Sequence, residues 1–202
     1  WGTAITAVFF IIGAVIAPVF ISPLLNHYKP LREGELKQNI LSLARSEGIP
    51  VTNVYEFDAS KQTKRMSANV SGLFGTTRIS MNDNLLNRGS DREIMAVLGH
   101  EIGHYVLGHV TTGIIMFGLV ILAGFAFTAW GFGFLTDLFG GVWDVRSVDD
   151  PAGLPVLMAV ASFFFLIATP VTNTIIRSQE AQADIFGVNA SRQPDGFAQA
   201  AL

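Results

Sequence analysis

Three long stretches of the chain carry no charged residue, and this feature constrains the fold more than any other. They occupy residues 1–26, 112–136 and 152–176. About 20 consecutive apolar residues are enough to cross the hydrocarbon core of a bilayer as a helix. Buried core helices of a soluble protein are the alternative, but three such runs in 202 residues favour a membrane. The sequence therefore predicts three transmembrane helices.

The overall composition narrows the class of protein. Only 14% of the residues are charged and the formal net charge is −3, whereas soluble domains carry about 25% charged residues. Nucleic-acid-binding proteins normally show a concentrated basic face, so we expect no nucleic-acid partner. The absence of cysteine excludes disulfide frameworks, thiol catalysis and cysteine-ligated zinc. Any zinc site must therefore use histidine and carboxylate side chains.

The charges beside the apolar runs indicate an orientation. Most Lys and Arg residues lie in residues 27–111, whereas the short loop 137–151 is rich in Asp. The positive-inside tendency places 27–111 and the segment 177–202 on the cytoplasmic side, with the loop on the other side. The chain starts at Trp1 and stops at Leu202 inside a predicted helix, so we expect a truncated part of a longer protein. The expected location is a bacterial inner membrane or the endoplasmic reticulum membrane, in contact with lipid.

Residues 27–111 are typical of a small α+β unit. A helix is predicted within 31–47 and a strand at 51–57, and segments 67–74 and 78–81 could pair as a hairpin. Ser90 and Glu93 have the Ser-x-x-Glu spacing of a capping box, which opens a helix that should run to about His109. The predicted fold class is mainly α and integral to the membrane, with three transmembrane helices and this small cytoplasmic α+β unit.

That last helix carries the motif His-Glu-x-x-His at residues 100–104. Two histidines four residues apart project from the same helix face and can bind one metal ion. Neutral imidazole suits zinc, which can polarise a peptide carbonyl. Glu101 lies about 100° further round the helix, where it can act as a general base without joining the ligands. The motif predicts one zinc ion per chain and hydrolysis of a peptide or protein substrate.

A catalytic zinc usually has three protein ligands and one open position. We expect His109 to lie outside the ligand set, because a helix continued over five residues turns it away from the face of His104. Glu180 is the better candidate. Glu180 and Asp184 share a helix face, so Glu180 could bind zinc while Asp184 accepts a hydrogen bond from a ligand histidine. A solvated helix that bears two ordinary acids is the alternative.

Three blocks of the sequence resemble the type I CAAX prenyl endopeptidases, which are integral-membrane zinc metalloproteases. The blocks are HEIGHYVLGH at 100–109, RSQEAQADIFG at 177–187 and the segment 57–86. The resemblance implies a set of roles: zinc ligands His100, His104 and Glu180, general base Glu101, and Asp184 as partner of a ligand. We further expect His109 and Arg177 to lie beside the ligands rather than among them.

The segment 57–86 is similar to the family segment that forms the edge strand beside the zinc. Ser67-Ala68-Asn69 stands where the family usually has Asn-Ala-Tyr, and Gly72 matches a family glycine. We therefore expect Ser67, Ala68, Asn69 and Gly72 to contact the substrate.

The expected function is a membrane zinc endopeptidase that processes the C-termini of prenylated or related peptides. An HtpX-like protease that degrades damaged membrane proteins is the first alternative, because it shares the His-Glu-x-x-His motif and the later Glu-x-x-x-Asp. A catalytically inactive membrane scaffold is the second, and the complete set of candidate ligands argues against it.

Overall fold

The computed structural model describes residues 26–72, 77–145 and 147–200, and it divides into two units. The described part of the first, which we call the apolar unit, is residues 112–177 apart from residue 146. The second, the α+β unit, comprises the described residues of 26–111 together with 178–200. The transmembrane helix predicted for residues 1–26 lies almost entirely outside the described residues.

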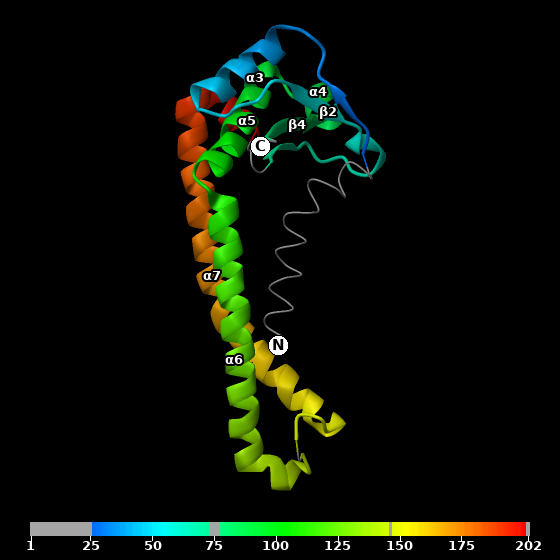
Figure 1. The fold of residues 1–202 in the computed structure, drawn as a ribbon, viewed down its shortest axis with the longest axis vertical. Coiled ribbons are helices and arrows are strands. Elements are labelled where there is room, and N and C mark those ends of the chain that lie inside the picture. The colour runs from blue at the N-terminus through cyan, green and yellow to red at the C-terminus, as the bar shows by residue number, and fades with distance from the viewer. Residues whose placement is uncertain (1–25, 73–76, 146, 201–202) are drawn as a thin grey trace. The chain divides into compact units, whose positions relative to one another are not determined.

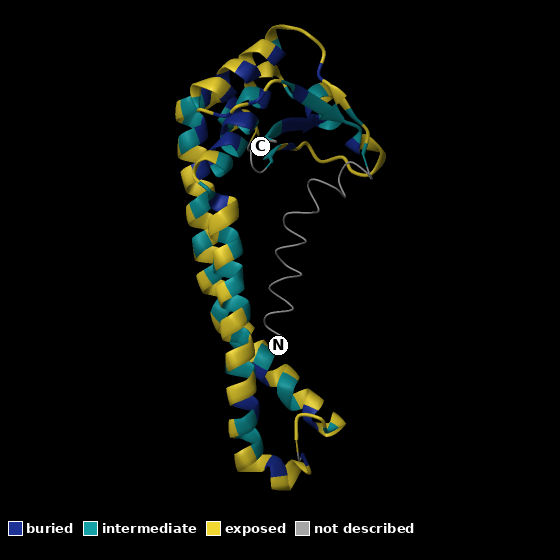
Figure 2. Cartoon of the chain, viewed as in Figure 1, coloured by how far each residue is buried: buried dark blue, intermediate teal, exposed yellow. Residues whose placement is uncertain are grey.

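Two long helices pass through the apolar unit (Figure 1): α6 at His109–Trp143 and α7 at Leu154–Ser191. A short 3-10 turn, η3, at Pro151–Gly153 precedes α7. Both helices are long and apolar enough to cross a membrane, and their most apolar 18-residue windows have only 6% and 11% of residues buried. Core helices of a soluble protein would be mostly buried, whereas Figure 2 shows few buried residues along α6 and α7. Two of the three predicted membrane helices are therefore present as apolar helices among the described residues.

Both helices extend beyond their predicted limits. The helix predicted at 112–136 continues to Trp143, through nearly half of the expected loop. The helix predicted at 152–176 runs without interruption to Ser191, so the segment that carries Glu180 is not a separate element. Charged residues end a run of apolar sequence but not the backbone hydrogen bonds of a helix, which explains both differences.

The α+β unit contains a four-stranded sheet in the order β1-β2-β4-β3. The strands are β1 at Tyr28–Pro30, β2 at Val54–Phe57, β3 at Ala68–Ser71 and β4 at Arg78–Asn82. β2 pairs in parallel with β4, whereas β1 and β3 pair antiparallel with β2 and β4. The predicted hairpin is confirmed as β3 and β4, and β3 forms one edge of the sheet.

The remaining elements of this unit are helices and one short turn. They are α3 at Glu35–Ser46, η2 at Ala59–Lys61, α4 at Asp83–Arg88, α5 at Asp91–Val106 and α8 at Pro194–Ala200. The hydrophobic core joins α3 and α5 to the inner face of the sheet. Its fully buried side chains include Ile40, Ile79, Met81, Leu98 and Ile102, and truncation of such a side chain to Ala typically costs about 2–5 kcal/mol.

The predicted capping box opens α5. The Ser90 hydroxyl accepts a hydrogen bond from the Glu93 backbone N–H at 3.3 Å, and the Glu93 carboxylate accepts one from the Ser90 N–H at 2.6 Å. The predicted end of this helix is wrong, because α5 stops at Val106. Gly108 has φ +69°, a left-handed conformation that interrupts a right-handed helix and that glycine adopts readily. His109 therefore begins α6.

A close contact between α5 and α7 organises the α+β unit. It is made by small residues four apart on each helix, Gly99 and Gly103 on α5 and Ala183 and Gly187 on α7. A Cβ atom at Gly99 would lie 2.9 Å from the Gly187 carbonyl oxygen, and one at Gly103 would lie 3.2 Å from the Ala183 Cα. Residues as small as Gly and Ala allow two helix backbones to approach closely. His100 and Glu180 therefore belong to helices that are in direct contact.

Substitution of Gly187 by Ala tests this contact. Its Cβ would lie 2.7 Å from the backbone nitrogen of His100 and 2.5 Å from the Phe197 ring. We expect a loss of about 1–3 kcal/mol in stability from overpacking, seen as a lower thermal midpoint of the purified full-length protein. Gly113→Ala is the matched control, because in the described part of the chain its Cβ would meet no atom within 4 Å. An equal midpoint for the two variants would contradict a tight contact.

Candidate metal centre

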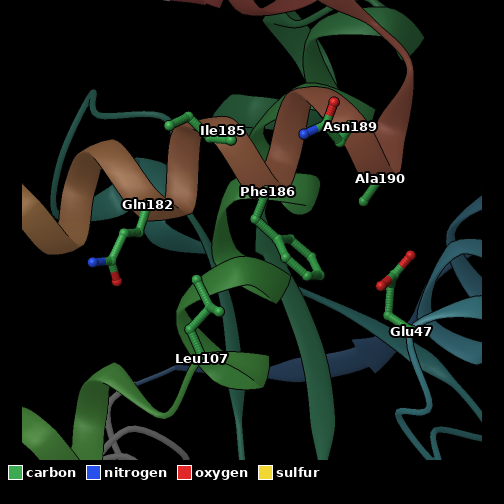
Figure 3. Close-up of a pocket in the computed structure, with 7 residues that line it drawn as sticks. All are labelled: Glu47, Leu107, Gln182, Ile185, Phe186, Asn189 and Ala190. Atoms are coloured by element: carbon green, nitrogen blue, oxygen red, sulfur yellow. The ribbon is translucent and has the colours of Figure 1, made fainter.

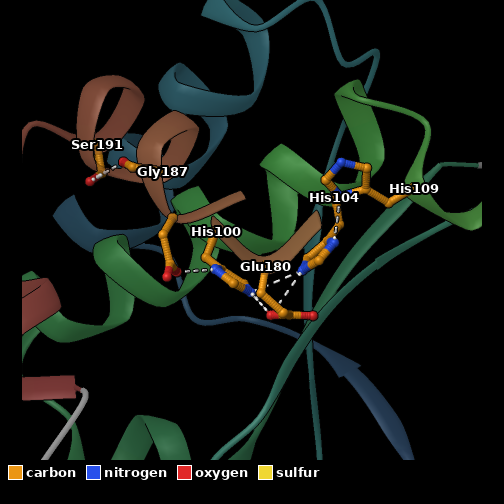
Figure 4. A network of polar contacts seen from close by, with 7 residues as sticks. His100, His104, His109, Glu180, Gly187 and Ser191 are labelled. Atoms are coloured by element: carbon orange, nitrogen blue, oxygen red, sulfur yellow. Dashed lines mark hydrogen bonds and ion pairs between the residues drawn. The ribbon is translucent and has the colours of Figure 1, made fainter. Parts of the chain in front are cut away.

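Three side chains from α5 and α7 converge on one point (Figure 4): His100, His104 and Glu180. The Nε2 atoms of the two histidines are 3.0 Å apart. The Glu180 Oε2 atom lies 3.4 Å from the first and 3.6 Å from the second. Ligand atoms at tetrahedral positions around a zinc ion are about 3.3 Å apart, given metal–ligand bonds of about 2.0–2.2 Å. The three atoms therefore have the spacing of three ligands around one ion.

Asp184 settles which nitrogen of His100 carries its proton. The Nδ1 atom of His100 lies 2.8 Å from the Asp184 Oδ1 atom. A carboxylate only accepts hydrogen bonds, so the Nδ1–H donates and Nε2 keeps a free lone pair. That lone pair points towards the place where a metal ion would sit, as in the carboxylate–histidine–metal arrangements of zinc proteins.

His104 is oriented by a second, uncharged chain of hydrogen bonds. Its Nδ1 atom lies 2.8 Å from the Nδ1 atom of His109, and the His109 Nε2 atom lies 3.2 Å from the Gln182 Oε1 atom. The amide oxygen accepts from the His109 Nε2–H, so the His109 Nδ1 atom is the acceptor for the His104 Nδ1–H. The Nε2 atom of His104 is then also an unprotonated lone pair.

These proton positions bring two lone pairs and one carboxylate oxygen together with no proton among them. Such atoms repel one another at 3.0–3.6 Å unless a cation lies between them. Two neutral imidazoles and one carboxylate are also the donor types that zinc prefers, and the set leaves a fourth position open. The chemistry of the donors and their spacing therefore both fit a catalytic zinc ion.

The location of His109 agrees with the expectation that it lies beside the ligands, but the reason given by the sequence is wrong. The helix does not continue from His104 to His109. Because α5 ends at Val106 and Gly108 is left-handed, the buried His109 ring lies against the outer nitrogen of His104.

Glu101 is half-buried next to the three converging side chains. Burial raises the pKa of its carboxyl group, and the negative charge of Glu180 adds to this while a charged His100 would oppose it. Burial lowers the pKa of His104, and a positive charge on His100 would lower it further. A carboxyl group with a raised pKa is suited to proton transfer, and a histidine with a lowered pKa stays neutral and able to bind a metal.

The residues predicted to contact substrate lie on or beside the edge strand. Ala68 and Asn69 belong to β3, Ser67 directly precedes it, and Gly72 directly follows it with φ +145°. One side of β3 pairs with β4, and the topology assigns no described strand to its other side. The position of these residues is compatible with the predicted role, which stays a prediction. Arg177 belongs to the apolar unit, its side chain is exposed, and its role also stays a prediction.

Sequence reasoning missed two residues that support the site. Gln182 accepts from His109, and it also borders a groove of about 480 Å³ that residues of α7 line together with Leu107 and Glu47 (Figure 3). Fully buried Asn82 caps α4 through the Leu85 N–H, accepts from the Ser67 N–H and donates to the Arg65 carbonyl oxygen. The position of Asn82 at the end of a predicted strand was the available signal. Gln182 gave none, because its partner is 73 residues away.

Comparison with known proteins agrees with this site. The sequence model of peptidase family M48 matches residues 30–202. The uncharacterized metalloprotease YhfN of Bacillus subtilis is 38% identical over 173 residues, covering 86% of this chain and 41% of YhfN. The CAAX prenyl protease 1 homolog of Dictyostelium discoideum is 34% identical over 184 residues, covering 88% of this chain and 42% of that protein.

The fold is also similar to a solved structure. The crystal structure of S. mikatae Ste24p superposes with a TM-score of 0.70 at 27% identity, over 93% of this chain and 47% of that one. The chain thus spans less than half the length of the relatives named here.

These observations define a metalloprotease fold with a candidate metal centre, and the chain belongs to peptidase family M48. The CAAX prenyl protease homologues and the Ste24p structure confirm the resemblance to the CAAX prenyl endopeptidases that the sequence predicted.

Asp184→Asn tests whether this carboxylate supports the metal centre. Loss of such a partner typically weakens metal binding about 10–100-fold, so we expect that change in zinc affinity, measured by competition with a chromogenic chelator. Asp149→Asn removes the same charge from an exposed position in the apolar unit and should leave the affinity unchanged. Equal affinities for both variants would show that the 2.8 Å contact with His100 has no role in metal binding.

Proposed function

We propose that this chain is the catalytic portion of a membrane zinc endopeptidase. The observation that carries the proposal is the convergence of His100, His104 and Glu180 within 3.0–3.6 Å next to a half-buried glutamate. His100, His104 and Glu180 hold the zinc ion, one per chain, and Asp184 and His109 fix the proton positions of the two histidines.

The protein residues supply binding, orientation and proton transfer. Zinc, when bound, supplies Lewis acidity that lowers the pKa of water and polarises the scissile carbonyl group. Glu101 accepts a proton from the attacking water and later delivers it to the leaving amine. Its raised pKa balances these two tasks, because a more acidic carboxyl group would hold the proton too weakly for the second transfer.

For the substrate, we propose C-terminal processing of prenylated or related peptides. The names of several relatives support this choice, among them the CAAX prenyl protease 1 of Saccharomyces cerevisiae, which is 42% identical over 106 residues. That match covers 52% of this chain and 23% of the yeast protein. The resemblance of residues 57–86 to the edge-strand segment supports the same choice over an HtpX-like protease. We further propose that the metal centre faces the cytoplasm of a bacterial inner membrane or the endoplasmic reticulum membrane.

Glu101→Gln separates chemistry from metal binding. In the full-length, zinc-loaded protein we expect the hydrolysis rate to fall by about 10²–10⁴-fold, the range that general-base catalysis contributes, while zinc stoichiometry stays at one. Cleavage of a farnesylated peptide is the assay, and His100→Ala is the reference variant that should lose the metal as well. Undiminished hydrolysis by the Glu101→Gln variant would refute the assigned base.

The same assay discriminates the alternatives. Cleavage of unfolded membrane proteins without turnover of the farnesylated peptide would favour the HtpX-like function. A full-length protein that binds no stoichiometric zinc and cleaves neither substrate would be a scaffold.

The raised pKa of Glu101 is testable in the metal-free protein. Burial and the charge of Glu180 raise this pKa, whereas the positive charge of bound zinc would lower it. In the zinc-free protein, titration of the Glu101 carboxyl group followed by NMR should therefore show a midpoint above the ordinary glutamate value of about 4.3. A midpoint at the ordinary value in the absence of zinc would contradict the effect of burial.

A further inference from the structure

A polar cavity lies on the outer face of the sheet, away from α5. Alternate residues of β4 point to opposite faces, and Ile79 and Met81 are fully buried in the core. Arg78 and Ser80 therefore face the other side, where they line a pocket of about 250 Å³ together with Ser67, Asn69, Ser71 and Tyr28. Ser67 and Asn69 are also predicted to contact the substrate, but the proposed hydrolysis gives Arg78 no role.

The charge of the pocket comes from Arg78. Its guanidinium carbon lies 4.4 Å from the centre of the Tyr28 ring, a stacked arrangement that leaves the N–H groups at the edge of the plane available. No carboxylate belongs to the pocket among the residues that the structure describes. One cation surrounded by serine hydroxyls and an asparagine amide is suited to binding an oxyanion, and Arg binds a carboxylate with two parallel hydrogen bonds.

The order and register of the strands place this charge on the β1 side of the outer face, at the level of the Ser67 end of β3. Tyr28 is opposite Phe57, and Phe57 is opposite Asn82, which donates its backbone N–H to the Ser67 carbonyl oxygen. The Arg78 side chain starts beside Ser71 and reaches diagonally across the outer face to Tyr28 on the opposite edge strand β1. It shares the pocket with Ser67.

A peptide can bind to the free side of β3 by adding a strand. Antiparallel pairing is the more stable arrangement, and a peptide that pairs in this way runs opposite to β3. Its C-terminal end then points towards Ser67, and a terminal carboxylate that passes Ser67 can turn onto the outer face, into the pocket that Ser67 and Arg78 both line. We propose that Arg78 and the polar pocket around it bind the terminal carboxylate of the peptide substrate. The inference rests on the proposed C-terminal processing, to which it adds a residue that determines specificity.

A matched pair of substrates tests this role in the full-length, zinc-loaded protein. One is a farnesylated peptide with a free terminal carboxylate, and the other is the same peptide as its C-terminal amide. We expect a kcat/KM for the acid that exceeds that for the amide by about tenfold or more, the contribution of a charged hydrogen bond. In Arg78→Gln this ratio should fall towards one, mainly through a higher KM for the acid, and Arg78→Lys should give an intermediate ratio.

The ratio does not depend on how much of a variant folds, because the same folded molecules cleave both peptides. Arg88→Gln is the control, since Arg88 lies on α4 and donates to the Lys64 carbonyl oxygen. It should keep the wild-type ratio. Equilibrium binding of both peptides to the Glu101→Gln protein gives a readout without turnover, and there too Arg78→Gln should abolish the preference for the acid.

The possible failures are distinguishable. If the wild-type protein cleaves both peptides equally well, or if Arg78→Gln leaves the ratio unchanged, the role of Arg78 is refuted and the proposed function stands. A wild-type protein with bound zinc that cleaves neither peptide refutes the proposed function and this inference with it. An unchanged ratio, combined with loss of thermal stabilisation by short-chain phosphatidic acid in Arg78→Gln, would assign the pocket to lipid phosphate instead.

Discussion

The contact between α5 and α7 is the constraint on which the rest of the site depends. Gly99, Gly103, Ala183 and Gly187 bring the two helix backbones within van der Waals distance. Gly99, Gly103 and Ala183 directly precede His100, His104 and Asp184, so the face that packs and the face that binds are about 100° apart on the same helix. His100 and Asp184 meet at 2.8 Å although 84 residues separate them, because the backbones behind them cannot move apart without losing the contact.

The two candidate ligand histidines are oriented by different means. His100 donates to a carboxylate whose side chain is 60% exposed, whereas His104 donates to a buried neutral imidazole that ends on an amide. A negative partner makes an imidazole more basic, and a neutral one fixes its orientation without adding charge. The two acidic groups of the centre, Asp184 and Glu180, are thus exposed to solvent. The neutral partner of His104, His109, is buried in the protein interior, where an unpaired charge would be costly.

Much of this arrangement could be predicted from the sequence, since the decisive signals are local. The apolar runs, the Ser90 capping box and the histidines four residues apart each depend on neighbours along one helix. The sequence does not predict β1 or the end of α5, because the local sequence signal for each element is too short or conflicts with its neighbours. Three-residue β1 has no alternating pattern. The end of α5 depends on the left-handed conformation of Gly108, which the residue type permits but does not require. The partnership of His109 with Gln182 depends on tertiary contact alone, so no periodicity could reveal it.

The small contact residues and the candidate ligands lie side by side on α5 and α7, and this has a consequence for protein design. A five-residue metal-binding motif grafted onto a foreign helix would carry its two histidines and its base but not the surface that brings the third ligand to them. The smallest portable unit is instead a pair of segments, residues 99–104 and 180–187, each of which carries both functional residues and the small residues that pack the two helices together. A graft that keeps the ligands and replaces the glycines would retain the recognisable motif and lose the geometry that makes it a binding site.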